Sequence, residues 1–318
     1  MKRSSPVEML AVAVCAAVVT PVVSKASHPP VIPAVAHAAR TTQSIVNSSG
    51  NGQYQFTTID VPGTSDTEAY GINNTGLVSG FYVVNGTGHG FLWRDGTLTT
   101  VDQGSGSNTL LGDVNEPGMV AGNYGPFNIQ HAAIFSIRTG MFTTLPDVPN
   151  LPINLGNGIN PQGEVVGSAA MGSVAAPFNS VGWIWDGRSY SFFTVPGAAG
   201  LGTEAVGINA PGSVSGYFQD GNGSFHGFLK QGSKFTTIDV PGAMNTFGFG
   251  LNNSGEQVGY YVDQQGDVHG FVLRAGKFNT IDVSGSLGTL VTNINERGDL
   301  VGLWFDSNAT HAFLATRR

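Results

Sequence analysis

Residues 56–63 read FTTIDVPG, and residues 235–242 repeat the same eight letters. A glycine-rich phrase follows each copy, AYGINNTGLVSGFY at 69–82 and GFGLNNSGEQVGYY at 248–261, and a His-Gly-Phe phrase comes next in both places. Weaker copies begin at Leu98, Phe142, Phe193 and Phe278, so successive copies start 42 to 51 residues apart. A repeat of this length is typical of propellers and other repeat proteins.

Each copy consists of four short apolar runs separated by turn sequences. In the first copy Phe56–Asp60 is rich in β-forming residues, and Val61-Pro62-Gly63 ends this run because proline cannot donate a ladder hydrogen bond. Asn74-Thr75-Gly76 and Asp95-Gly96 are tight-turn sequences. Four strands in roughly 43 residues is the content of one propeller blade. A stacked solenoid is the alternative, although solenoids usually have a shorter period and need not close.

The strand built on Gly-Ile-Asn indicates the number of blades. It occurs six times, centred on Ile72, Val114, Ile159, Ile208, Leu251 and Ile294. The sequence therefore predicts an all-β fold, a six-bladed β-propeller of four-stranded blades. The Asn that ends each of these strands is expected to hydrogen-bond its own turn. We also predict that the N-terminal strand, Phe56–Asp60, pairs with residues 311–316 and so closes the ring.

The composition agrees with one large β domain over residues 54–318. The chain of 318 residues contains 46 glycines, and 41% of its residues are hydrophobic but only 11% are charged. This balance suits tight turns and short strands better than long amphipathic helices. The formal net charge of -7 argues against a nucleic-acid partner, which requires a basic face.

The N-terminal segment is expected to be an export signal over residues 1–26. Lys2 and Arg3 precede an apolar run that is short for a membrane span, and cleavage as late as residue 38 is an alternative. Residues 27–53 are predicted to be a flexible leader. Cys15, the only cysteine, lies inside the apolar run, so the mature chain has no thiol. We therefore expect a secreted protein, extracellular or periplasmic, with no membrane span in its mature chain.

The repeated phrases resemble those of the HAF-repeat family of probable extracellular proteins. The family's letters match His311-Ala312-Phe313, and the related HGF triplet begins at His89, His226 and His269. The resemblance spans residues 54–316 and implies secretion and a propeller-like fold. It implies no catalytic residue. The third copy departs most from the pattern, since Val181 replaces the histidine.

The repeated histidines are predicted to pair with aspartates. Three of these pairs are 13 residues apart and centred on a tight turn, so their side chains should face each other across a hairpin, and ring closure adds a fourth. The pairs are His89–Asp102, His226–Asp239, His269–Asp282 and His311–Asp60. A structural role is preferred to a metal site, because zinc needs three or four ligands at one point. No cofactor is expected, with calcium in the Asp-rich loops 220–223 and 263–267 as an alternative to ordinary turn chemistry.

No known catalytic motif occurs in a suitable context, so no catalytic residue is assigned. The main hypothesis is a secreted, non-enzymatic binding or interaction module for a glycan or a cell-envelope partner. The alternative is a secreted propeller hydrolase or lyase acting on polysaccharide, which would need carboxylates or a metal converging on the axis. The expected ligand face carries aromatic residues at the ends of second strands, although these rings could instead pack between blades. They are Tyr82, Tyr124, Tyr217, Tyr261 and Trp304.

Overall fold

The computed structural model describes residues 44–46, 53–104, 107–173 and 176–318. Within these ranges all the regular secondary structure consists of β-strands, which are numbered β1 to β25. The expected signal over 1–26, with Cys15, and most of the expected leader lie outside the described residues. The described part contains no helix that is long and apolar enough to span a membrane.

Four of the sheets are separate four-stranded units in which neighbouring strands follow each other in the chain. The first consists of β3 (Thr67–Ile72), β4 (Val78–Val84), β5 (Thr87–Arg94) and β6 (Thr97–Val101). The second consists of β7 (Asn108–Val114), β8 (Met119–Gly125), β9 (His131–Ser136) and β10 (Met141–Thr144). The third consists of β11 (Ile153–Ile159), β12 (Val165–Ser173), β13 (Ala176–Trp185) and β14 (Tyr190–Phe193). The fourth consists of β15 (Thr203–Ile208), β16 (Val214–Gln219), β17 (Phe225–Gln231) and β18 (Lys234–Ile238).

The remaining strands form one nine-stranded sheet. One half contains β19 (Asn245–Leu251), β20 (Gln257–Val262), β21 (Val268–Arg274) and β22 (Lys277–Ile281). The other half contains β23 (Gly288–Ile294), β24 (Leu300–Phe305), β25 (Thr310–Arg317), β2 (Tyr54–Ile59) and β1 (Ser44–Val46). The expectation of six separate blades is therefore not met, because parallel pairing between Val268 and Gly288 joins the two halves. The fold is all-β and propeller-like, with four-stranded blades.

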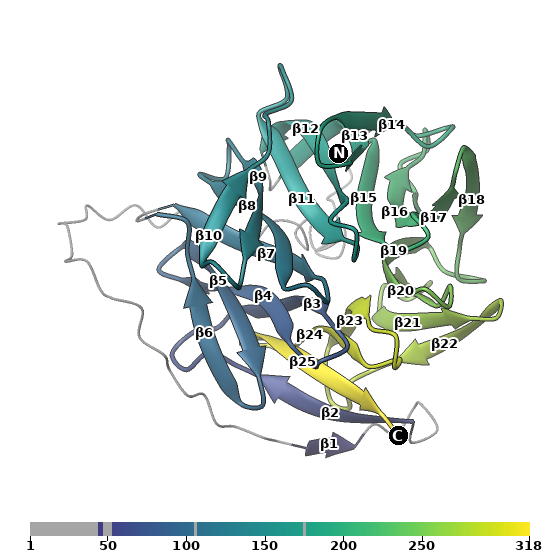
Figure 1. Ribbon diagram of the computed structural model, residues 1–318. Helices are drawn as coiled ribbons and strands as arrows, with labels where there is room; N and C mark the ends of the chain where they lie inside the picture. Colours follow the sequence, from purple (N-terminus) through teal and green to yellow (C-terminus); the bar gives the residue numbers. More distant parts are fainter. Residues whose placement is uncertain (1–43, 47–52, 105–106, 174–175) are drawn as a thin grey trace.

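The first strands of the repeats lie around a common centre (Figure 1). Strands β3, β7, β11, β15, β19 and β23 each contact the next, and β23 contacts β3. Glycines permit this close approach. A Cβ on Gly207 would lie 2.9 Å from the carbonyl oxygen of Phe249, and one on Gly158 would lie 2.5 Å from that of Val206. Side chains at these positions would force the inner strands apart.

The asparagines at the ends of these strands form a closed hydrogen-bonded ring. The carbonyl oxygen of each side chain accepts an N–H from its own turn, as in Asn115 with Met119 at 2.8 Å, so the local role expected from the sequence is observed. The side-chain amide also donates to the backbone carbonyl of the next asparagine in the ring, at 2.9 to 3.4 Å. The order is Asn73, Asn115, Asn160, Asn209, Asn252, Asn295 and again Asn73.

The N-terminal strand closes the ring, as predicted. Strand β2 pairs antiparallel with β25, with Phe56 opposite Ala315 and Ile59 opposite Ala312. Three residues of the expected leader, Ser44–Val46, form β1 and pair with the other edge of β2. First and last repeats are thus held together by main-chain hydrogen bonds, which removes two sheet edges.

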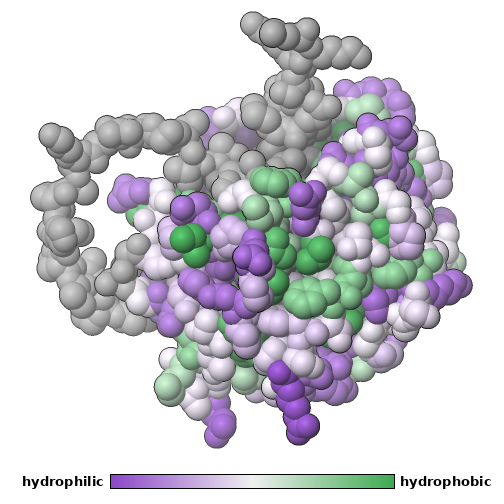
Figure 2. Space-filling model, turned by 90° about the horizontal axis from the view of Figure 1, so that it is seen from above, coloured by the Kyte–Doolittle hydropathy of each residue, from purple (hydrophilic) through white to green (hydrophobic). Residues whose placement is uncertain are grey.

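The hydrophobic core contains the same buried side chain from several of the repeats. The phenylalanine of each His-Gly-Phe or His-Ala-Phe phrase is fully buried, namely Phe91, Phe228, Phe271 and Phe313. Each such ring removes about 150 Å² or more from water, so these side chains contribute much of the stability of the packing between sheets. On the face seen in Figure 2, hydrophobic side chains lie in patches with hydrophilic ones between them.

Candidate active site

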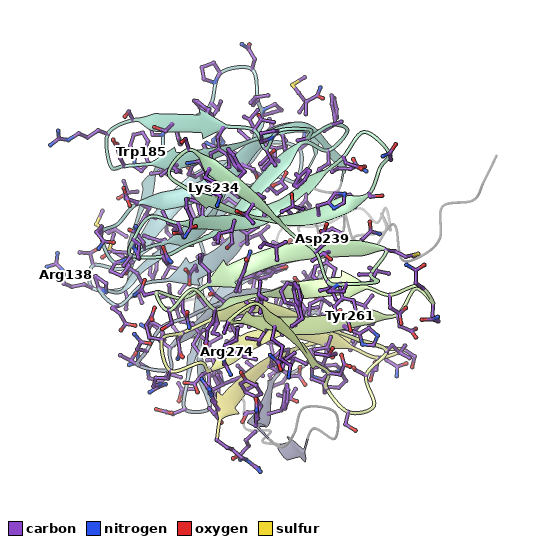
Figure 3. All side chains as sticks on the ribbon, turned by 90° about the vertical axis from the view of Figure 1, so that its right-hand side faces the viewer. Arg138, Trp185, Lys234, Asp239, Tyr261 and Arg274 are labelled. Atoms are coloured by element: carbon purple, nitrogen blue, oxygen red, sulfur yellow. The ribbon has the colours of Figure 1, made fainter. Side chains whose placement is uncertain are left out.

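The molecule has two unlike faces. One carries the short turns between first and second and between third and fourth strands, and we call it the turn face. The other carries the connections between repeats and the loops between second and third strands, and we call it the loop face. In Figure 3 Arg138 and Trp185, from the turn face, lie on the left, and Asp239 and Tyr261, near the loop face, lie on the right.

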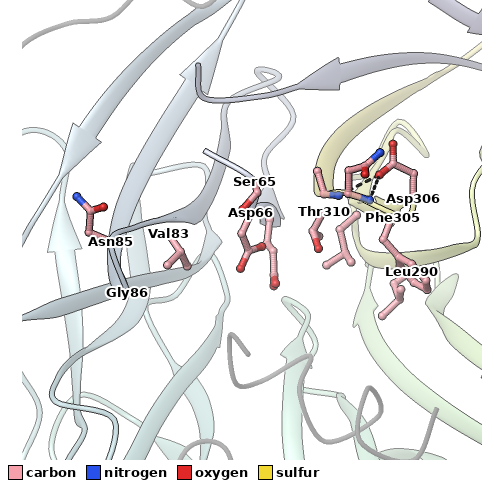
Figure 4. Close-up of a pocket in the computed structure, with 13 residues that line it drawn as sticks. Ser65, Asp66, Val83, Asn85, Gly86, Leu290, Phe305, Asp306 and Thr310 are labelled. Atoms are coloured by element: carbon pink, nitrogen blue, oxygen red, sulfur yellow. Dashed lines mark hydrogen bonds between the residues drawn. The ribbon is translucent and has the colours of Figure 1, made fainter. Parts of the chain in front are cut away.

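A cavity of about 450 Å³ opens on the loop face between the first and last repeats. It is bounded on one side by β3 and the loop after β4, and on the other by β23, β24 and the loop before β25 (Figure 4). Asp66 and Glu68 lie in its wall together with Phe305, Asp306 and Thr310. Its volume and its mixture of polar and apolar groups are those of a small-molecule site.

Strand alternation places both acids on one wall. Asp66 directly precedes β3 and Glu68 lies two residues further on, so their side chains point to the same face. Glu68 is only 6% exposed, and the Tyr70 hydroxyl donates to its Oε2 at 2.6 Å. The Oδ1 atom of Asp66 is buried and has no hydrogen-bond partner within the described residues.

Burial alters the acidity of this pair. It raises the pKa of Glu68 well above its ordinary value, and the charge of Asp66 raises it further. Burial also raises the pKa of Asp66, against a hydrogen bond from Glu68 that lowers it. Two carboxyls in such contact share one proton. The pair therefore offers a proton donor, Glu68, beside a proton acceptor, Asp66.

Asp66 departs from the role its position has elsewhere in the repeat. Two other repeats have asparagine at this position, Asn108 and Asn245, and each accepts an N–H of the preceding repeat through Oδ1, from Gly88 at 2.8 Å and Phe225 at 2.9 Å. At the closure between last and first repeats, the Thr310 N–H donates instead to the Ser65 carbonyl at 2.9 Å. Asp66 therefore does not hold a neighbouring repeat through Oδ1, and the residue lines the cavity.

Glu68 also departs from its repeat. The equivalent positions in four other copies are apolar, namely Leu110, Leu155, Phe247 and Leu290. The exception is Glu204, which is 3% exposed and accepts a hydrogen bond from Ser168. Burial raises the pKa of Glu204. Glu204 does not line the cavity. We did not single out either glutamate from the sequence, although an acid in a column of apolar residues was the available signal.

A second, smaller cavity of about 100 Å³ lies at the centre of the turn face, beside the asparagine ring. Asp113 lies half-buried in its wall and accepts the Val114 N–H at 2.8 Å. Burial raises the pKa of Asp113 to about 7, although backbone hydrogen bonds oppose the shift. This residue was also missed, because other repeats have glycine or asparagine at the position.

The structure brings together all four predicted His–Asp pairs. The Nδ1 atoms of His89, His226, His269 and His311 lie 2.9 to 3.0 Å from the nearest carboxylate oxygen of their expected partners, Asp102, Asp239, Asp282 and Asp60. A fifth pair, His131 and Asp147 at 2.8 Å, was missed because its partners are 16 residues apart. No group of three or more possible metal ligands occurs in the described part of the chain.

The aromatic residues of the expected ligand face pack against these histidines. The ring centroids of Tyr82, Tyr124, Tyr261 and Trp304 lie 4.1 to 5.4 Å from those of the adjacent histidines, and all four side chains are half-buried. Tyr217 is buried against Phe247 and Phe249, and Phe218 takes the place next to His226. None of the five predicted residues lines the acidic cavity.

The two loops that the sequence offered as alternative calcium sites have the geometry of ordinary turns. Asp220 accepts the N–H groups of Asn222 and Ser224, each at 2.9 Å. Asp263 makes the same contacts with Gln265 and Asp267. These aspartates therefore hold their own loops.

Comparison with known proteins supports the fold. No family model matches the sequence, and no curated protein matches it. Among solved structures, a gluconolactonase from Xanthomonas campestris has a TM-score of 0.52 and 13% identity, covering 91% of this chain and 99% of its own. An oligogalacturonate lyase from Vibrio parahaemolyticus has a TM-score of 0.50 and 10% identity over 87% and 97% of the two chains. A streptogramin B lyase has a TM-score of 0.50 and 10% identity over 84% and 98%.

Proposed function

We propose that this protein is a hydrolase or lyase acting on glycans, with Asp66 and Glu68 as its acid–base pair. The observation that carries the proposal is a buried carboxyl pair of unequal acidity in the wall of a cavity. Paired carboxyls with separated pKa values are how acid and base roles are divided at one site. Three enzymes share the fold at low identity, so the fold supports such chemistry, but the site carries the argument.

The cavity suits a polyhydroxylated ligand. Asn85, Asn308 and Thr310 offer hydrogen-bonding side chains, and the half-buried ring of Phe305 offers an apolar surface. Sugars present hydroxyl edges and C–H faces, and such a mixed lining can bind both.

In hydrolysis the two acids would divide the proton transfers. Asp66 takes a proton from water as the water oxygen bonds to the anomeric carbon. Glu68 gives its proton to the leaving glycosidic oxygen as that C–O bond breaks. The proton then passes from Asp66 to Glu68 through their shared hydrogen bond, which restores both groups.

One observation favours a second candidate, the non-enzymatic binding module. Asp66 and Glu68 hydrogen-bond to each other, whereas the carboxyls of glycosidases lie about 5 Å or more apart. A carboxylate that keeps its neighbour's proton can accept hydrogen bonds from sugar hydroxyls without catalysis.

The test is reducing-end release from a panel of neutral, cationic and anionic polysaccharides, with glycan binding measured in parallel. Glu68→Gln and Asp66→Asn should each lower turnover by about 100-fold or more. Glu204→Gln is the matched control, since it changes an equally buried acid at the same repeat position outside the cavity, and it should retain activity. Binding that depends on Asp66 without any cleavage would favour the binding module. Full turnover by the Glu68 variant would contradict the proposal.

Three further expectations remain proposals. We infer that the nine-stranded sheet represents two blades, giving six in all, because each half contains four adjacent antiparallel strands of blade type and the asparagine ring takes one residue from each of six repeats. We also propose that the chain is secreted. The similarity of its phrases to HAF repeats supports membership of that family.

A further inference from the structure

Positive charge is confined to one face of the molecule, whereas acids lie on both faces. All the lysines and arginines of the described residues lie on the turn face, in its short turns, at the strand ends next to them or at the end of the chain. They are Arg94, Arg138, Arg188, Lys230, Lys234, Arg274, Lys277, Arg297, Arg317 and Arg318. Ten aspartates lie on the loop face, and they are Asp60, Asp66, Asp102, Asp147, Asp220, Asp239, Asp263, Asp267, Asp282 and Asp306. At neutral pH, a ligand that approaches the cavity therefore meets a negative potential.

The cavity itself follows this pattern. Its lining contains three acids, Asp66, Glu68 and Asp306, and no lysine or arginine. Asp306 accepts the N–H groups of Asn308 at 2.7 Å and Ala309 at 2.9 Å, and these bonds lower its pKa. Asp306 is therefore ionised at neutral pH even though Glu68 keeps its proton more readily. In Figure 4 Asp66 lies between Val83 on one side and Thr310 and Asp306 on the other.

Such a lining discriminates between substrates by charge. A uronate or phosphate group would lose its hydration and face two carboxylates without a compensating cation, which is costly. An ammonium group could instead donate to the carboxylate of Asp66, which lines the cavity, and be attracted by Asp306.

We propose that the substrate is an amine-bearing glycan, such as an oligomer of glucosamine, and that the reaction is hydrolysis. This inference rests on the proposed function. Elimination from a uronate would need a positive group to stabilise the sugar's carboxylate as the neighbouring proton leaves. The cavity lining offers none, so bond cleavage by water is the reaction it suits.

The test compares tetramers of glucosamine, N-acetylglucosamine and galacturonate at 20 and 200 mM salt, in a chelator so that no metal contributes. At low salt kcat/KM should be about tenfold higher for the glucosamine tetramer than for the neutral one, because one more charge pair forms. High salt should reduce this preference. Binding of the three tetramers is measured with the Glu68→Gln variant.

Asp306→Asn isolates the charge. The asparagine keeps the oxygen that accepts the two N–H groups of the turn, so the loop should stay folded. KM for the glucosamine tetramer should rise about fivefold, with kcat unchanged. The matched control is Asp220→Asn. Asp220 holds the corresponding turn of another repeat, beside His226, and lies outside the cavity.

The outcomes separate the two proposals. Cleavage of the neutral or anionic tetramer in preference to the cationic one, dependent on Glu68, would overturn the substrate class and leave the proposed function standing. Binding of the glucosamine tetramer that depends on Asp306, without cleavage of any tetramer, would keep the ligand class and overturn catalysis. Equal effects of the Asp306 and Asp220 variants, or activity lost in the chelator, would overturn the amine-binding inference.

Discussion

At the residue scale, the proposed acid–base pair departs from the repeat pattern. Glu68 and Asp113 replace the apolar or glycine residue that most other copies carry, and Asp66 replaces an asparagine found in two of them. Each replacement puts a carboxyl where it is desolvated, and each carboxyl has a raised pKa. The His–Asp pairs behave in the opposite way, since they recur in most copies and hold loops together. In a repeat protein, a residue that breaks the pattern is therefore the better candidate for a specific task.

The raised pKa of Asp113 predicts how the stability of the protein depends on pH. Its pKa rises from 3.8 in the unfolded chain to about 7 in the folded one, so the folded state binds more protons between these values. Stability should fall as pH rises from about 4 to 7, by a few kcal/mol at most. Asp113→Asn should remove this loss and be more stable than the parent protein at pH 8.

Urea unfolding at pH 4.5 and pH 8.5 measures the effect. Glu116→Gln, at the exposed mouth of the same cavity, is the control. If the Asp113 variant loses as much stability across this range as the parent protein, then Asp113 is not the responsible group.

At the scale of elements, the strand that joins first and last repeats matters most. Strand β2 lies next to β25 in the nine-stranded sheet, so it pairs with a strand from the far end of the chain. Its residues alternate between core and solvent, with Phe56 2% exposed and Gln55 exposed. The same closure places Asp66 beside the loop before β25 and so builds one wall of the cavity.

Phe56→Ala should destabilise the protein by about 3 to 5 kcal/mol, because the ring packs against Phe313 with centroids 5.3 Å apart and leaves a cavity when removed. Gln55→Ala, one residue earlier on the solvent side, should change stability by less than about 0.5 kcal/mol. Denaturant unfolding compares the two. Equal, small effects would mean that β2 is not part of the cooperative core.

At the scale of the whole molecule, the asparagine ring ties the repeats into one unit. Each asparagine side chain hydrogen-bonds to its own turn and to the next repeat, so its removal weakens both the turn and the contact between repeats. A closed ring makes the folded state depend on all repeats together, unlike an open solenoid, where each repeat contacts only its neighbours.

Asn209→Ala should lower stability by about 2 to 3 kcal/mol, because it removes the bond to the Asn252 carbonyl and leaves the Ser213 N–H without its acceptor. Asn222→Ala, in an exposed loop of the same repeat, should cost less than about 1 kcal/mol. Thermal unfolding of both variants is the measurement. A variant at Asn209 as stable as the one at Asn222 would show that the ring contributes little.

The sequence by itself determined much of this protein. The repeated phrases predicted an all-β propeller-like fold, four strands per unit, closure by Phe56–Asp60 and the four His–Asp pairs. Strand alternation and turn chemistry are local, so residues a few positions apart suffice to predict them. The pairing of His311 with Asp60 could also be predicted, because the repeat itself supplied the missing partner.

The cavity and its acids were decided only by the tertiary structure. Asp66 and Glu68 reach Asp306 because the closure brings together residues some 240 positions apart in sequence, and no local pattern encodes that distance. The same holds for the raised pKa of Glu68, which depends on burial by surrounding strands. The joining of the two halves of the nine-stranded sheet through Val268 and Gly288, and the packing of the aromatic rings on histidines, likewise depend on how sheets meet. Local sequence determines strands and turns, whereas desolvation and the meeting of distant groups arise only from packing.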